Sequence, residues 1–386
     1  METRKLYYED SHLYEFSARV TGCTATGSSY AVTLDATAFY PEGGGQACDL
    51  GTLGGAAVLD VQEHGDDVIH LCDSPLTIGE TVTGRIDQAR RFDLMQQHTG
   101  EHIVSGIVCA RYGYHNVGFH IGAEGITIDF DGPIPADALP QIEAAANQAV
   151  WQNLPVRCWY PTQGELPSVE YRTKKALPWP VRIVEVAGVD KCACCGVHVQ
   201  STGEIGLIKL FSCVKFHQGV RIEMACGGRA LEILNTVYDQ NRQVSQAFSA
   251  KAFVTGEAAR KMNERLAAAE YRCAALERKI WDTTAEGYAH KGNVLHIEPS
   301  LTPLAVRELA DRIADRCDGI AAVLSGIDGN FNLCLVSKIG DVKELGNNLK
   351  TALNARGGGK SGIFQGTVPA TQGQITDFFH DWFARK

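Results

Sequence analysis

The chain has 386 residues, of which 45% are hydrophobic, 21% charged and 8% aromatic. These proportions are typical of folded globular proteins, and the length indicates two or three domains, so wholesale disorder is excluded. No apolar run reaches the roughly 18 to 20 residues that a membrane helix needs, and the N-terminus lacks an apolar signal-peptide core. We therefore expect a cytoplasmic protein that has no membrane partner.

The cysteines and charges narrow the class of protein further. The thirteen cysteines are odd in number and mostly stand singly in apolar stretches, which argues against a secreted disulfide framework. Residues 1–90 hold 5 Lys+Arg and 14 Asp+Glu, so they account for the net charge of −9. The remaining three-quarters of the chain is neutral overall, and any nucleic-acid surface is expected there.

The first half of the chain indicates an α+β fold. Residues 1–89 read as a β-barrel-like domain of short strands, in which 57–61 and 68–72 flank a polar turn. Residues 90–228 read as a second domain: a helix over about 90–111, strands within 117–130, a helix over about 136–153, and strands near 181–186 and 206–224. The mixture of helices and strands places this domain in the α+β class.

Two further segments follow. Residues 229–290 carry apolar positions at alternating spacings of three and four, with a break at 255–256, which predicts an antiparallel helical hairpin. This hairpin could serve as a spacer or as the interface of a homodimer. Residues 291–386 predict a small α/β domain with a glycine-rich loop over 357–362, after its second helix.

Two short motifs suggest a metal site. His98 and His102 lie four residues apart within a predicted helix, so both imidazoles project from one face. Cys194 and His198 follow about ninety residues later, and thiolate and imidazole are ligands that zinc prefers. The two pairs together supply the four ligands of one tetrahedral zinc site per chain. Buried or redox-active thiols beside an unrelated histidine are the alternative.

The same histidine pair permits a second function. His98, Glu101 and His102 formally match the inverted zincin pattern, in which two histidines bind zinc and the glutamate is the base of a metalloprotease. A catalytic zinc keeps one position open, however, whereas four protein ligands close the site. The pattern also requires a distant acidic third ligand, which the sequence does not identify.

The motifs in their order resemble a known family. The segment DATAFYPEGGGQ over 35–46, the histidine pair, the Cys194/His198 pair and GVRIE over 219–223 resemble the editing domain of alanyl-tRNA synthetase and the freestanding alanyl-tRNA editing proteins. The helical hairpin, the glycine run and FQG over 364–366 resemble the C-terminal region of the synthetase. No preceding segment could house an aminoacylation domain, so the resemblance implies the long freestanding form, a trans-acting deacylase.

The resemblance also implies roles for individual residues. It implies that zinc is held by His98, His102, Cys194 and His198, and that Gln46 is a polar contact in the catalytic pocket. It makes Thr37 the candidate partner for the hydroxyl of serine, since a site that hydrogen-bonds a substrate hydroxyl rejects alanine, which lacks it. The implied partner is tRNA(Ala) mischarged with serine or glycine.

The sequence departs from the pattern of the family at a few positions. Glu101 is charged where relatives commonly have a small or neutral residue. Cys195 stands where glycine is usual, and with Cys192 it forms a pair that could compete for the metal. Arg356, just before the glycine-rich loop, and Lys360, within it, are candidates for binding tRNA phosphates. A structural turn is the alternative.

Overall fold

The computed structural model describes residues 2–122, 125–173 and 179–385. The chain has a mixed α+β structure, as predicted, and it divides into two compact units, Met1–Gln243 and Val244–Lys386. The four predicted domains, with boundaries at 89, 228 and 290, remain a finer prediction. None of the helices in the described ranges is both long and apolar enough to cross a membrane.

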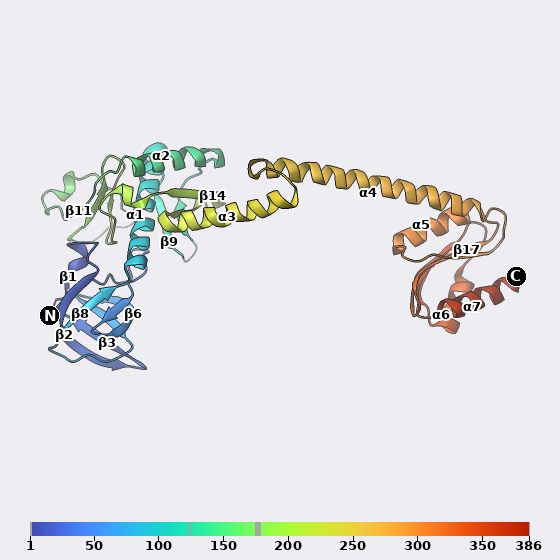
Figure 1. Ribbon diagram of the computed structural model, residues 1–386, viewed down its shortest axis with the longest axis horizontal. Coiled ribbons are helices and arrows are strands. Elements are labelled where there is room, and N and C mark those ends of the chain that lie inside the picture. The colour runs from blue at the N-terminus through green and yellow to red at the C-terminus, as the bar shows by residue number, and fades with distance from the viewer. Residues whose placement is uncertain (1, 123–124, 174–178, 386) are drawn as a thin grey trace. The chain divides into compact units, whose positions relative to one another are not determined.

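The first unit begins with a closed barrel (Figure 1, blue). Buried and more exposed side chains alternate along its strands, because successive residues of a strand point to opposite faces. In barrel order the strands are β2 (Glu15–Thr26), β3 (Ser29–Leu34), β7 (Asp67–Cys72), β6 (Ala56–His64), β5 (Gly51–Leu53) and β8 (Thr81–Ile86). The predicted hairpin is present as the antiparallel pair of β6 and β7. Beside the barrel, β1 (Arg4–Lys5) pairs in parallel with β4 (Ala36–Thr37).

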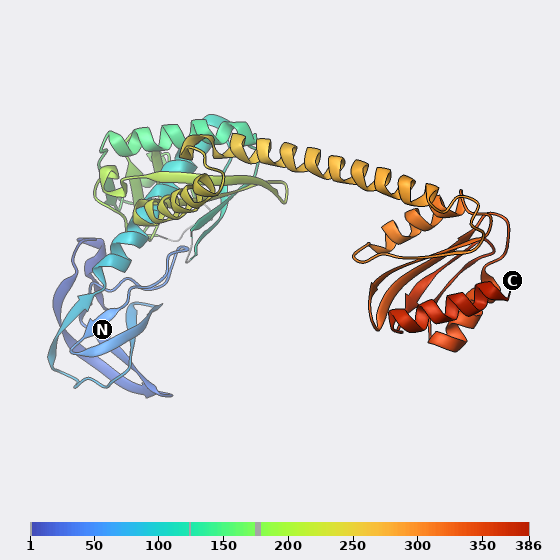
Figure 2. The ribbon, with the colours of Figure 1, turned by 45° about the vertical axis from the view of Figure 1, so that its right-hand side comes forward.

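A long helix, α1 (Gln88–Tyr112), connects the barrel to the rest of the first unit (Figure 2). It begins where the side chain of Asp87 accepts a hydrogen bond from the backbone N–H of Arg90, and it ends at Gly113, whose φ is 71°. Every residue from Leu94 to Gly106 is buried. The histidine pair therefore lies on the part of the helix that is packed on all sides.

Two antiparallel sheets and one helix pack around α1. The larger sheet has the strand order β14 (Ile208–Phe216), β15 (Gly219–Cys226), β10 (Ile126–Phe130) and β9 (Asn116–Ile121). The smaller sheet has the order β11 (Val156–Trp159), β12 (Ile183–Val186) and β13 (Asp190–Ala193), and the helix is α2 (Leu139–Trp151). Neither β11 nor β13 was predicted, because each is only four residues long and without a clear alternation of apolar residues.

The segment predicted as a helical hairpin forms two helices, α3 (Gly227–Ala247) and α4 (Thr255–Glu286). The first unit ends within α3, whereas α4 belongs to the second unit. Antiparallel packing of the two helices therefore remains a prediction, as does a homodimer. Single turns of 3-10 helix occur at Leu6–Tyr8, Ala136–Ala138, Leu166–Ser168, Thr202–Ile205 and Ala252–Val254.

The second unit contains one five-stranded sheet with helices on both faces (Figures 1 and 2). The strand order is β16 (Val294–Ile297), β17 (Ile320–Ile327), β18 (Asn330–Ser337), β20 (Ile363–Val368) and β19 (Arg356–Lys360). Ala321 and Val323 face a core shared with α5 (Pro303–Ala314), whereas Ala322 and Leu324 face a core shared with α6 (Lys343–Leu353) and α7 (Gln372–Ala384). Adjacent residues of β17 thus pack against helices on opposite faces of the sheet.

The prediction of a glycine-rich loop over 357–362 was wrong for most of that segment. Residues 356–360 form β19, an edge strand, which pairs antiparallel with β20. A methyl group added to Gly357 would lie 2.2 Å from the carbonyl oxygen of Gln365. Only glycine allows the two backbones to approach so closely. Glycine has a low intrinsic propensity for β-strands, so the composition of the segment suggested a loop. Arg356 and Lys360 lie exposed at the two ends of the strand.

Candidate metal centre

The structure brings the two predicted ligand pairs together in the first unit. One ligand atom from each of His98, His102, Cys194 and His198 lies within 4.8 Å of every other. The sulfur of Cys194 is 3.4 Å from Nε2 of His98. All three histidines are buried. One helical turn thus presents two imidazoles, and the segment after β13 presents the thiol and the third imidazole.

Each imidazole is oriented through its second nitrogen. The three Nδ1 contacts are with Gln46 Oε1 at 2.7 Å for His98, Asp190 Oδ2 at 3.1 Å for His102 and Thr99 Oγ1 at 3.1 Å for His198. The amide oxygen and the carboxylate can only accept, so Nδ1 of His98 and His102 carries the hydrogen and Nε2 carries the lone pair that a metal requires. The hydroxyl of Thr99 can donate or accept, so it orients the ring of His198 without fixing its tautomer. Nε2 of His198 is buried and has no hydrogen-bond partner. An orphaned nitrogen of this kind is expected where an ion belongs.

The electrostatics of the cluster also suit a metal. Burial alone would raise the pKa of the Cys194 thiol, but interactions with His98, His102 and His198 outweigh it and hold that pKa well below its ordinary value. Burial holds the pKa of His198 well below its ordinary value, and His98 adds to the effect. A thiolate and a neutral imidazole are the protonation states in which Cys194 and His198 bind metal. For His102, burial is outweighed by Asp190 and Cys194, which hold its pKa well above its ordinary value, so a metal would have to displace a proton there.

The neighbouring cysteines fit the site less well. Cys192 is buried and could join His102 and Asp190 in a second group of three ligands. Burial raises the pKa of Cys192 to about 11, so this thiol keeps its proton at neutral pH. Cys195 is exposed and belongs to neither group. The sulfur best placed for a metal is therefore that of Cys194.

The loop that ends in Gln46 shows why its glycines are needed. The backbones of Gly43 and Gln46 exchange two hydrogen bonds of 3.0 Å, and the two residues between them, Gly44 and Gly45, have φ of 60° and 84°. These left-handed conformations favour glycine. A methyl group on Gly45 would also come within 2.6 Å of the ring of Phe119. The turn thereby delivers the amide of Gln46 to the ring of His98.

A buried arginine shapes the loop that carries Cys194. Nη1 of Arg182 donates to the carbonyl oxygens of Cys194, at 3.0 Å, and Gly196, at 2.7 Å. A methyl group on Gly196 would come within 2.2 Å of the ring of His98. The loop can therefore close over the histidines only with glycine at this position.

Sequence reasoning missed the residues that hold this centre in place. Arg91, in the first turn of α1, makes a buried ion pair with Asp49 at 2.9 and 3.0 Å. Arg172 binds Asp190, the partner of His102, through two bonds of 2.7 and 2.8 Å. A cation near a helix N-terminus opposes the helix dipole, so Arg91 could have been suspected of having an anionic partner. No local feature of the sequence identifies Asp190.

Thr37 lies inside the barrel, completely buried, and its hydroxyl already has partners. Nδ1 of His70 contacts the carbonyl oxygen of Val32 at 3.1 Å and therefore donates, so Nε2 accepts the hydroxyl hydrogen of Thr37 at 2.8 Å. The same hydroxyl oxygen accepts the backbone N–H of Phe39 at 3.1 Å. The hydroxyl can take part in a further interaction only as an acceptor. Its proposed contact with a substrate remains a prediction.

Glu101 is engaged by neighbours on its own side of α1. Its Oε1 accepts hydrogen bonds from Ser105 Oγ, at 2.5 Å, and from Asn116 Nδ2. Asp190 also lies beside a histidine ligand, but it contacts the outer nitrogen of His102. Nothing in the described residues favours the metalloprotease alternative.

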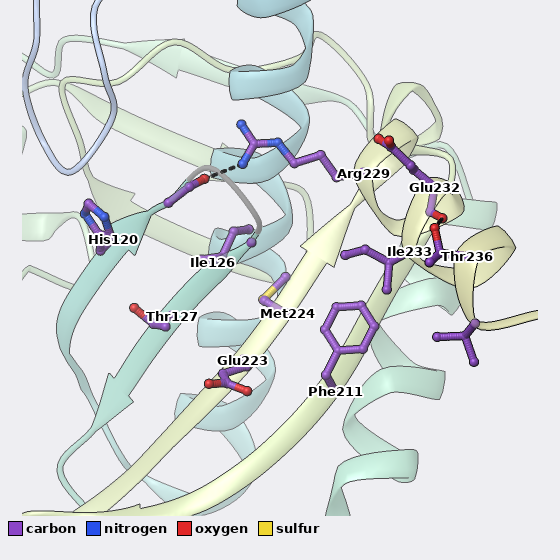
Figure 3. Close-up of a pocket in the computed structure, with 13 residues that line it drawn as sticks. His120, Ile126, Thr127, Phe211, Glu223, Met224, Arg229, Glu232, Ile233 and Thr236 are labelled. Atoms are coloured by element: carbon purple, nitrogen blue, oxygen red, sulfur yellow. Dashed lines mark hydrogen bonds between the residues drawn. The ribbon is translucent and has the colours of Figure 1, made fainter. Parts of the chain in front are cut away.

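The first unit also has an open cavity of about 940 Å³ between the larger sheet and α3 (Figure 3). Its walls include Phe211 and Glu223 from the sheet and Arg229 and Ile233 from the helix. Arg229 is held by Asp93 and by the backbone of Gly122. None of the four candidate ligands lines this cavity, so it is separate from the metal centre.

Two family models match parts of the first unit. Residues 181–223 match the threonyl and alanyl tRNA synthetase second additional domain, and residues 4–90 match the class II (A) tRNA synthetases. The first match includes Cys194 and His198, and the second includes the barrel and Gln46. Both matches fall on elements that build the cluster.

Similar proteins extend the likeness over most of the chain. The Xenopus laevis alanyl-tRNA editing protein Aarsd1-A is 29% identical over 351 residues, which are 88% of this chain and 85% of that protein. The chain is a relative of the alanyl-tRNA editing proteins. The Danio rerio protein Aarsd1 is 25% identical and matches over 92% of both chains.

The likeness also reaches the synthetases. The alanine–tRNA ligase of Ignicoccus hospitalis is 30% identical over 93% of this chain, which spans only 40% of that enzyme. The crystal structure of the C-Ala domain from Aquifex aeolicus alanyl-tRNA synthetase matches 24% of this chain and 92% of that domain, at 19% identity and a TM-score of 0.21. The relationship to the alanyl-tRNA editing proteins, which the motifs predicted, is confirmed by the sequence matches.

Proposed function

We propose that this protein is a deacylase that hydrolyses the ester between a wrong amino acid and tRNA(Ala), with serine as the main substrate and glycine as the second. The observation that carries the proposal is the buried His/Cys cluster beneath the loop that presents Gln46. This cluster occurs in a chain whose relatives include alanyl-tRNA editing proteins. The cytoplasm, where tRNA is charged, is the expected location.

The cluster is the proposed site of one zinc ion per chain. The donor set of three imidazoles and one thiolate fits zinc, and so does the orphaned Nε2 of His198. When bound, zinc would supply a positive charge that positions the amino acid or polarises its carbonyl group. His98, His102, Cys194 and His198 would hold it.

Gln46 has a distinct role in this proposal. Its Oε1 accepts the hydrogen of His98 Nδ1, so its amide nitrogen must point elsewhere, and that nitrogen is buried without a hydrogen-bond partner. A buried donor that lacks an acceptor costs about 1–3 kcal/mol. We assign it to the ester carbonyl oxygen, which gains negative charge as water attacks.

Thr37 is the proposed sensor of the serine hydroxyl. Because His70 takes the hydrogen of Thr37, the oxygen of Thr37 offers an acceptor to a hydroxyl that donates. Serine has such a hydroxyl, whereas alanine and glycine do not, so this contact accounts for the preference for serine and not for cleavage of the glycine ester. A site that uses this bond rejects alanine far better than a gap of methyl size would.

The deciding experiment compares hydrolysis of Ser-tRNA(Ala), Gly-tRNA(Ala) and Ala-tRNA(Ala) by the purified chain, with Cys194→Ala as the control. We expect the serine ester to be cleaved much faster than the alanine ester and the variant to be inactive. Equal rates on the serine and alanine esters would refute the proposal. Cleavage of a peptide that is lost in Glu101→Gln would support the metalloprotease instead.

Arg356 and Lys360 are proposed to contact tRNA phosphates. Both are exposed at the ends of β19, whose three glycines leave the backbone uncovered between them. Such contacts position a nucleic acid without reading its sequence. The acidic first ninety residues are poorly suited to supply this affinity.

A further inference from the structure

The long helix of the second unit, α4, exposes an apolar stripe along most of its length. Apolar residues recur there at alternating spacings of three and four, which places them on one face of a helix. They are Ala259, Met262, Leu266, Ala269, Cys273, Leu276 and Ile280. The four large side chains of this stripe are between 42% and 58% exposed. We call this face the α4 seam.

The core of the second unit packs against the opposite face of α4. Trp281 and Ala285 are the buried residues of this helix, and they share a core cluster with α5. When the seam takes positions a and d of a heptad, Trp281 falls at b and Ala285 at f, on the far side of the helix. Arg278, also at f, pairs with Glu308 of α5. The core of the second unit therefore forms without the seam.

The residues that flank the seam are divided by charge. Position g is basic and position e is acidic, with Arg265, Arg272 and Lys279 at g and Glu270 and Glu277 at e. All five side chains belong to exposed residues. None of the five forms an ion pair within the described part of the chain. A row of cations thus runs along one side of the seam and a row of anions along the other.

We propose that α4 pairs with α4 of a second copy of this chain as a parallel, two-stranded coiled coil. In such a pair each g residue faces the e residue five positions later on the other helix. Arg265 then meets Glu270 of the second copy, and Arg272 meets Glu277. The two-fold symmetry of the pair repeats each contact, so four ion pairs flank the buried seam. Each side chain of the seam packs against its own counterpart.

The same charges disfavour an antiparallel pair of α4 helices. In an antiparallel coiled coil, g faces g and e faces e. Arginine would then meet arginine along one side of the seam, and glutamate would meet glutamate along the other. Like charges in these positions destabilise the pair, so the parallel orientation is the one that the sequence of α4 matches.

The helical hairpin predicted from the sequence offers α3 as another partner for the seam. The apolar positions of α3 continue at spacings of three and four, so its own e and g positions can be assigned. These are Leu231, Ile233, Tyr238, Gln240, Ser245 and Ala247. None of them is charged, so α3 has no ions to match the two charged rows beside the seam. A second copy of α4 matches both rows.

The first test measures the monomer–dimer equilibrium of the full-length chain by analytical ultracentrifugation. Leu276→Ser should weaken the dimer at least about tenfold, because both copies lose apolar burial in the seam. Tyr271→Ser is the matched control, since Tyr271 lies at position f and is 77% exposed. It should dimerise like the wild type. Both side chains are exposed in the single chain, so neither change threatens its fold.

The second test exchanges the sign of the charges. The double variant Arg265→Glu/Arg272→Glu and the double variant Glu270→Arg/Glu277→Arg each turn the four attractive pairs into repulsive ones. Each variant alone should dimerise at least about tenfold more weakly than the wild type. An equimolar mixture of the two should restore a dimer, because the flanking charges are then opposite again.

A control and a cross-link complete the design. Arg260→Glu/Lys261→Glu makes the same change of charge at exposed positions b and c, away from the seam, and should leave the dimer intact. For the orientation, Ile280→Cys is combined with Cys273→Ala, and the protein is mildly oxidised. In a parallel pair position 280 faces itself, so peptide mapping should find a disulfide between the two copies there. In an antiparallel pair it faces position 262, and the two cysteines would lie about 27 Å apart.

A wild-type chain that stays monomeric at high concentration would overturn the proposal. So would a dimer that Leu276→Ser leaves intact, or one that forms no cross-link at position 280. The inference does not depend on the editing reaction. A monomeric chain that cleaves Ser-tRNA(Ala) would keep the proposed function and lose this interface, whereas an inactive chain that dimerises as described would do the reverse.

Discussion

The buried imidazole of His70 makes the stability of the barrel depend on pH. Desolvation lowers the pKa of His70 from 6.5 to about 4, and its hydrogen bond with the carbonyl of Val32 offsets only part of that effect. Between these two values the unfolded chain binds a proton that the folded barrel excludes. Stability therefore falls as the pH falls. At about 1.4 kcal/mol per pH unit, the barrel should lose roughly 3 kcal/mol between pH 7 and pH 4.

The perturbation that isolates this effect is His70→Gln. Glutamine can donate to the carbonyl of Val32 and accept from Thr37, but it does not titrate in this range. We expect the variant to be less stable than the wild type at pH 7, because it loses the packing of the ring against Phe39. Its stability should nevertheless change much less between pH 7 and pH 4. His64→Gln, at an exposed position of the same barrel, should behave like the wild type.

The assay must report on the barrel alone, because the chain has more than one unit. Protein equilibrated in urea at each pH is labelled by a brief pulse of hydrogen exchange at one common pH. Peptides from β3 and β7 then give the folded fraction of the barrel. If His70→Gln kept the full pH dependence of the wild type, the buried neutral imidazole would not be its source.

Four further outcomes are expected. Cys194→Ala should lose stoichiometric zinc, as measured by metal analysis, because a thiolate is removed from the set of four; full retention would end the assignment. Gly196→Ala should weaken zinc binding by at least about tenfold in chelator competition, since the added methyl would displace a histidine ring. Thr37→Val should narrow the difference between the rates on Ser-tRNA(Ala) and Ala-tRNA(Ala) by about 10 to 100 times, and unchanged selectivity would remove Thr37 from recognition. Replacing both Arg356 and Lys360 by alanine should raise KM for tRNA, reduce its salt dependence and leave kcat nearly constant; an unchanged KM would argue against phosphate contacts there.

Local sequence patterns were sufficient to predict most of the helices and strands. The hairpin of β6 and β7 lies where the sequence predicted it, and the helix that carries the histidine pair was predicted to within a few residues at each end. These segments are predictable because their apolar period reflects the face that they bury. β19 was not predictable in this way, because its glycines become a strand only when β20 lies close beside them.

The motifs by themselves determined the relationship to the editing proteins and the identities of the four candidate ligands, since ligand type and spacing along a helix are properties of the sequence. Only the tertiary structure decided what surrounds those ligands. The carboxylate of Asp190, the amide of Gln46 and the charge of Glu101 meet the histidines through contacts between a barrel loop, a helix and a small sheet. No periodicity encodes such contacts, because they depend on where distant segments pack. That packing gives His98 and His198 a hydrogen-bond partner, places a carboxylate beside His102 and leaves Nε2 of His198 without a partner.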